Sequence, residues 1–79
     1  MAVEDKAREV TFNLVEHIGV FGKDGRGWTR ELNRVSWNEG PVKYDIRNWN
    51  AEHQKMSRGI TLTQQELSDF RNLIEELKL

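Results

Sequence analysis

The chain has 79 residues, no cysteine and a formal net charge of −1 at pH 7. A chain of this length forms one domain with a small core, and the lack of cysteine excludes disulfides and thiolate metal sites. No apolar run approaches the roughly 20 residues that span a bilayer, so we expect a cytoplasmic protein with a flexible segment 1–9 and a single domain 10–79.

The first predicted strand lies within residues 10–21, because apolar side chains alternate there onto one face. These are Val10, Phe12, Leu14, Ile18 and Val20. Glu16 interrupts the alternation, which predicts either a β-bulge or a far half of the strand that leaves the core. The glycine-rich stretch 22–27 then suits a mobile hairpin loop or a basic finger over a ligand.

The second predicted strand covers residues 28–38 and changes its apolar phase half-way. Trp28 and Leu32 share one parity, whereas Val35 and Trp37 share the other, so we expect a bulge or bend near Asn33 and Arg34. The stretch NEGP, residues 38–41, predicts a turn in which the glycine takes the positive φ.

The third predicted strand, PVKYDIRNWN at residues 41–50, has two different faces. The apolar parity, with Tyr44 and Ile46, is expected to face the core. The opposite parity carries Lys43, Asp45, Arg47 and Trp49. A polar segment and a short strand within residues 58–62 complete a four-stranded antiparallel sheet.

A helix of about 16 residues is predicted at the carboxyl end, where Thr63 and Glu66 form a capping-box pattern. Its apolar stripe is expected to cover one face of the sheet and to leave the other face bare, giving an α+β fold. The stripe alone leaves open whether Phe70, Leu73 and Leu77 face their own sheet or a second helix.

Charge and aromatic residues are concentrated in the middle of the chain. Residues 20–62 carry eight basic and five acidic side chains together with all three tryptophans. Cations follow phosphates and flat rings stack on unpaired bases, so this mixture on a bare sheet face favours single-stranded nucleic acid. Charge by itself is equally compatible with an ordinary mixed-charge surface.

Catalytic and metal-binding patterns are not found in the sequence. His17 and His53 have no recognisable metal spacing and are expected to be surface or hydrogen-bonded histidines. The glycine-rich stretch lacks the Lys-Ser/Thr of a phosphate-binding loop, and no serine has a base-and-orienter pattern. We therefore predict a protein that is not an enzyme and that needs no metal or cofactor.

Residues 43–67, KYDIRNWNAEHQKMSRGITLTQQEL, resemble the signature of the transcriptional coactivator positive cofactor four family. The runs VEHIGV, GWTRELNRVSW and KYDIR are similar to its bacterial, YdbC-like branch. The resemblance implies a four-stranded antiparallel sheet and a helix, paired through the helices into a homodimer that binds single-stranded DNA. It also implies that Arg47, Trp49 and Arg58 occupy DNA-facing positions, and that Trp37 matches an aromatic of the preceding hairpin.

The leading hypothesis is a homodimeric single-stranded DNA-binding protein with little sequence preference, acting in transcription regulation, replication or repair. Its candidate contacts are Lys23, Arg26, Trp28, Arg30, Arg34, Trp37, Lys43, Arg47, Trp49 and Arg58, and its candidate dimer contacts are Phe70, Leu73 and Leu77. The alternatives are a protein-interaction module of the transcription machinery and a single-stranded RNA binder.

Overall fold

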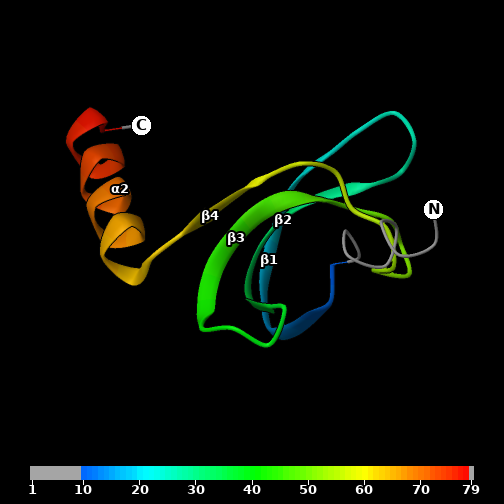
Figure 1. The fold of residues 1–79 in the computed structure, drawn as a ribbon. Helices are drawn as coiled ribbons and strands as arrows, with labels where there is room; N and C mark the ends of the chain where they lie inside the picture. The colour runs from blue at the N-terminus through cyan, green and yellow to red at the C-terminus, as the bar shows by residue number, and fades with distance from the viewer. Residues whose placement is uncertain (1–9, 79) are drawn as a thin grey trace.

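The computed structural model describes residues 10–78, which form an antiparallel sheet and one helix (Figure 1). The strands are β1 (Phe12–Lys23), β2 (Thr29–Trp37), β3 (Val42–Trp49) and β4 (Ile60–Leu62), in that spatial order, and α2 spans Gln64–Leu77. The predicted α+β architecture is confirmed. The predicted flexible segment 1–9 lies outside the described residues.

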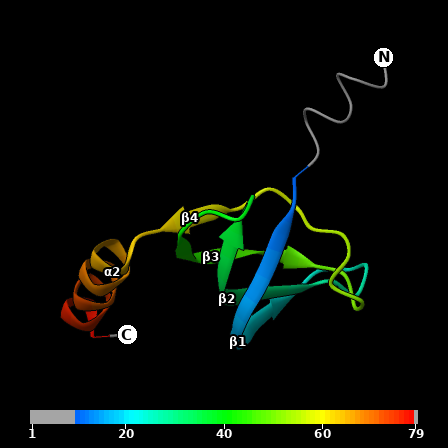
Figure 2. The ribbon, with the colours of Figure 1, turned by 60° about the horizontal axis from the view of Figure 1, so that its bottom comes forward.

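β1 follows β2 with three register shifts, which fall between Leu14 and Glu16, between His17 and Gly19, and between Val20 and Gly22. The first shift confirms the bulge predicted at Glu16. Each bulge bends the strand and increases its twist, so the sheet curls toward one side (Figures 1 and 2).

β2 pairs with β3 in unbroken register from Thr29 to Ser36, so of the bulge or bend expected near Asn33 and Arg34, the bulge is not found in β2. The extra residues lie in β1 instead, and β2 keeps a strict alternation of side chains. The β2–β3 turn also differs from the prediction, because Asn38 and Glu39 take the positive φ values of 52° and 60°, and Gly40 does not. Two left-handed central residues are the geometry of a type I′ hairpin turn.

The core lies on the side of the sheet that was expected to be bare. Among the described residues, the fully buried apolar side chains are Val35 and Trp49, and both belong to the parity that also carries Asp45. Tyr44 and Ile46, on the predicted core parity, are only half-buried. The expected assignment of faces is therefore wrong, because the curl of the sheet encloses the Trp49 side.

β4 pairs with β3 over three residues and depends on a close approach just before it. A Cβ atom on Gly59 would collide with the carbonyl oxygen of Ile46 and with the Cβ of Arg47. Only glycine therefore allows the chain to reach β3 at this point.

α2 begins with the predicted capping box. Thr63 Oγ1 accepts from the Glu66 backbone N–H at 3.1 Å, and the Glu66 carboxylate accepts from the Thr63 backbone N–H at 2.8 Å. The helix stands away from the sheet at the end of β4 (Figures 1 and 2) and has no buried residue. The expectation that it covers its own sheet is wrong, because a single cap residue joins β4 to α2 and leaves no connection long enough to fold back. Among the described residues, no helix has the length and apolar character needed to cross a membrane.

Candidate nucleic-acid interface

An open pocket of about 300 Å³ lies where β2, β3 and β4 meet. Its lining residues are Trp37, Pro41, Lys43, Arg47 and Thr61. The type I′ turn places Trp37 at the end of β2, and Lys43 follows at the start of β3 with an exposed side chain. The pocket thus combines an aromatic ring, an exposed cation and a hydroxyl, which together can receive a base, a phosphate and a sugar.

Arg47 enters this pocket as part of an ion pair. Its Nε and Nη2 donate to the two carboxylate oxygens of Asp45 at 2.6 and 2.7 Å, and its guanidinium lies 4.5 Å from the centre of the Trp37 ring. Nη1 contacts the Ser57 carbonyl at 3.4 Å and the Met56 sulfur at 3.8 Å. With its side chain 14% exposed, Arg47 is a cross-link between β3 and the segment before β4 as well as a candidate phosphate contact.

Trp49 does not offer a surface for stacking. Its exposed fraction is 0%, and its ring packs against Phe12 and His53 at centroid distances of 5.1 and 5.6 Å. The expectation that this ring lies on a bare face is therefore wrong, because β1 and the segment after β3 close over it. Trp49 therefore packs in the core. Of Trp37 and Trp49, only Trp37 is partly exposed.

Two of the predicted cations lie on the other side of the sheet. Arg30 donates from Nε to Asn48 at 2.9 Å, and Arg34 forms an exposed ion pair with Glu16 at 3.2 Å. By the alternation of β2, both side chains share the parity of Leu32, which faces α2. The structure therefore does not bring Arg30 and Arg34 together with Lys43.

The remaining candidates lie near the ends of the sheet. Asp24 Oδ1 accepts from the backbone N–H groups of Arg26 and Trp28 at 2.8 and 3.1 Å, which closes the β1–β2 loop. The Arg26 guanidinium lies 4.4 Å from the centre of the Trp28 ring. Lys23 ends β1 and Arg58 precedes β4, both with exposed side chains. None of these four residues lines the pocket beside Trp37.

The sequence analysis missed a buried polar cluster on the enclosed face. Glu31 accepts from Thr29 Oγ1 at 2.6 Å, from Asn33 Nδ2 at 3.0 Å and from His53 Nε2 at 2.9 Å. Burial alone would raise the pKa of the Glu31 carboxyl, but the hydrogen bonds from Asn33, Thr29 and His53 lower it below its ordinary value. Glu31 and Asn33 share the parity of Val35, and that shared parity is the signal in the sequence that could have placed them in the core.

Within residues 10–78, no group of three histidine, cysteine, aspartate or glutamate side chains is arranged to hold a metal ion.

Similarity to known proteins bears on the family of this chain. The family described as Transcriptional Coactivator p15 (PC4) matches residues 25–73. An uncharacterized protein of Treponema pallidum (strain Nichols) is 38% identical over 68 residues, which cover 86% of this chain and 80% of that protein.

The chain belongs to the PC4 family. The family resemblance seen in the sequence is thereby confirmed. The PC4 match runs from the β1–β2 loop into α2, and it includes all of β2, β3 and β4. Every residue that lines the pocket beside Trp37 therefore lies within the PC4 region.

Proposed function

We propose that this chain is a single-stranded DNA-binding protein with little sequence preference, which acts as a homodimer in transcription regulation, replication or repair. The membership of the PC4 family supports a DNA-binding, coactivator-like role. The proposal is for a binding protein and not for an enzyme, and it requires neither a cofactor nor a metal.

The observation that carries the proposal is the pocket formed by Trp37, Lys43 and Arg47. A single strand exposes the faces of its bases, which an aromatic ring can receive by stacking, while a duplex hides them. Lys43 is exposed and can follow a phosphate, and Arg47 lies over one face of Trp37, so a base on that side would stack on the guanidinium plane. Stacking and phosphate attraction read no base identity, so little sequence preference is expected.

Dimerisation is supported by the uncovered stripe of α2. Phe70, Leu73 and Leu77 are 46%, 60% and 66% exposed in the single chain, although each is a large apolar side chain. Burying such a side chain is worth about 1.5 to 3 kcal/mol. A helix that exposes three of them in one stripe is therefore incomplete without a second apolar surface.

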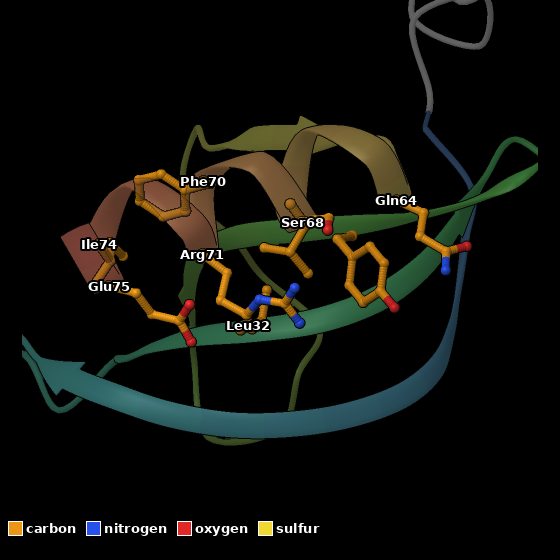
Figure 3. A pocket seen from close by; sticks show the side chains of 9 residues that line it. Leu32, Gln64, Ser68, Phe70, Arg71, Ile74 and Glu75 are labelled. Atoms are coloured by element: carbon orange, nitrogen blue, oxygen red, sulfur yellow. The ribbon is translucent and has the colours of Figure 1, made fainter.

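An open groove of about 480 Å³ lies between α2 and the sheet (Figure 3). Figure 3 shows Phe70 and Ile74 on the helix side of this groove and Leu32 on the strand that forms its other wall. The second copy of the same stripe is a partner of suitable chemistry, since a two-fold dimer lets each helix enter the groove of the other protomer.

The test of DNA binding is a salt-titrated fluorescence series with oligo-dT, a matched duplex and oligo-U. We expect tight binding to oligo-dT and weaker binding to the duplex, with a log-log salt slope of about −0.7 per phosphate neutralised. Lys43→Gln should weaken binding severalfold and make the slope shallower by about 0.7.

Lys78→Gln is the matched control, because it removes one exposed positive charge at the end of α2, outside both the pocket beside Trp37 and the groove between α2 and the sheet. Equal affinity for duplex and single strand would contradict the proposal, as would equal losses in the two variants. Preference for oligo-U would assign the pocket to RNA. If no oligonucleotide binds even at low salt, the face is a protein-interaction surface instead.

A further inference from the structure

His17, Glu31 and His53 come together from β1, β2 and the segment between β3 and β4. His53 Nε2 lies 2.9 Å from each carboxylate oxygen of Glu31, and His17 Nδ1 lies 3.4 Å from one of them. The Glu31 side chain is 2% exposed, whereas the side chains of His17 and His53 are 49% and 38% exposed and can exchange protons with water. A buried negative charge is thus flanked by two groups that can become positive.

The hydrogen-bond pattern fixes the direction of every donor. The ionised Glu31 carboxylate has only acceptors, so His53 Nε2 carries a proton and donates it. Asn33 Nδ2 donates to Glu31, which leaves Asn33 Oδ1 to accept from His17 Nδ1 at 2.7 Å. His53 can therefore donate to Glu31 whether it is neutral or positively charged, and only the strength of the contact changes.

The other charged groups on this face are paired elsewhere or lie farther away. Arg47 is the cross-strand partner of Glu31, but its guanidinium is held by Asp45. Lys23 lies at the register position opposite Thr29, at the end of β1, with its side chain exposed. The histidines are consequently the groups that meet the Glu31 charge at close range.

The segment that carries His53 is a compact loop. Asn50 Oδ1 accepts from the backbone N–H groups of Gln54 and Lys55 at 2.9 Å each, and the His53 N–H donates to the Asn50 carbonyl at 3.0 Å. His53 itself has a φ of 57°, which turns the chain so that its ring reaches Glu31. These hydrogen bonds hold residues 50–55 together, and His53 joins them to β2 through Glu31.

The same segment also contacts Arg47 of β3. Ser57 donates its backbone N–H to the Asn48 carbonyl at 2.9 Å, and its own carbonyl accepts from Arg47 Nη1. Arg58 follows immediately. Any movement of residues 50–59 away from the sheet would thus displace Arg58 and would remove the contact between the Ser57 carbonyl and Arg47.

We propose that His53 and Glu31 form a proton-responsive latch, which holds residues 50–59 against the sheet and so positions Arg47 and Arg58. Histidine is the side chain that changes charge between pH 5 and 8. A hydrogen bond between an imidazolium and a carboxylate is stronger than one from a neutral imidazole, so the latch closes more tightly at the acid end of this range. The effect on nucleic acid rests on the proposed function, whereas the latch itself does not.

The latch also changes the charge beside the pocket. With both imidazoles neutral, the three-residue cluster carries one negative charge, and with both protonated it carries one positive charge. A positive cluster next to Arg47 attracts phosphate, so closure and charge act in the same direction.

The primary test is amide hydrogen exchange on the free protein at about pH 5.5 and pH 8, the range in which histidine titrates, corrected for the intrinsic rates. The N–H groups of Asn50, His53 and Ser57 should be about fivefold better protected at the lower pH. In His53→Gln the amide can still donate to Glu31 but gains no charge, so the dependence on pH should disappear. His17→Gln is the matched control, and its protection should still depend on pH as in the wild type.

Equal protection at both pH values in the wild type would overturn the latch, and so would a pH response that survives in His53→Gln but is lost in His17→Gln. Oligo-dT binding at constant salt then tests the link to function, with an affinity at least about twofold higher at pH 5.5 than at pH 8. A pH-dependent loop with pH-independent binding would overturn that link alone. A latch that responds in a protein that binds no oligonucleotide would support the latch and refute the proposed function.

Discussion

Asp45 and Arg47 form the closest charged pair on the enclosed face, and this pair limits how freely Arg47 can meet a phosphate. Asp45 is fully buried and accepts two hydrogen bonds from the same guanidinium. Asp45→Asn should lower the free energy of unfolding by about 2 kcal/mol, since it weakens charge-assisted hydrogen bonds. The folded variant should bind oligo-dT more tightly, because Arg47 is no longer neutralised. Urea unfolding and fluorescence titration measure the two effects.

Asp69→Asn removes the same charge from the exposed surface of α2, away from the candidate contacts, and serves as the control for Asp45→Asn. If the two variants gained equal affinity for oligo-dT, the gain would come from net charge alone. The ion pair with Asp45 would then not limit the contact of Arg47 with DNA.

Glu31 makes the stability of the fold sensitive to acid. Because the pKa of its carboxyl is lowered in the folded protein, its contribution is present above the ordinary value of 4.5 and is lost as the pH falls below that value. Glu31→Gln should therefore lower the free energy of unfolding by about 2 kcal/mol at pH 7, and the difference from wild type should shrink toward pH 3. Urea unfolding at these pH values measures it, and the exposed change Glu76→Gln should leave the unfolding free energy nearly unchanged at pH 7.

The β2–β3 turn places Glu39 at a positive φ, a backbone conformation that glycine adopts more easily. Glu39 has a φ of 60°, a region that costs an ordinary residue about 1 to 2 kcal/mol and costs glycine little. Glu39→Gly also gives the unfolded chain more freedom, so the net gain in the free energy of unfolding should be about 0.5 kcal/mol. Thermal unfolding should show a rise in Tm of about 2 to 4 °C. Glu39→Ala keeps the strained φ and should give no such rise.

The strands and the helix could be predicted from local patterns, because alternation, capping and turn residues act within a few positions. Thr63 and Glu66 fixed the start of α2, and the interrupted alternation at Glu16 marked a bulge in β1. The side of the sheet that becomes the core could not be predicted from β3 alone. That choice depends on the curl produced by the bulges in β1 and on the loop that carries His53.

The candidate site was partly predictable for the same reason. Lys43 and Arg47 share a parity within β3, so their common face follows from the period of the strand. Trp37 reaches them only through the register of the hairpin, and the burial of Trp49 depends on Phe12 from β1. Residues brought together by long-range pairing are visible only in the folded chain.

At the scale of the whole molecule, the enclosed core is small, and large apolar side chains are exposed on both β1 and α2. Val35 and Trp49 are the fully buried apolar residues among those described, and the buried residues beside them are the polar Glu31, Asn33 and Asp45. A polar core of this kind stabilises a single chain weakly, whereas joining two α2 stripes would add a second apolar core. The stability of the protein should therefore increase with its concentration.

Leu73→Asp tests this view of the molecule. Leu73 is 60% exposed in the single chain, so for a monomer the change would alter the free energy of unfolding by only about 0.5 kcal/mol. For a dimer it places a charge in an apolar interface, and we expect sedimentation equilibrium to give twice the chain mass of 9.3 kDa for the wild type and 9.3 kDa for the variant. Asn72→Asp adds the same charge on the opposite side of α2 and should remain dimeric. A wild type that sediments at 9.3 kDa over the whole micromolar range would show that α2 does not pair two chains.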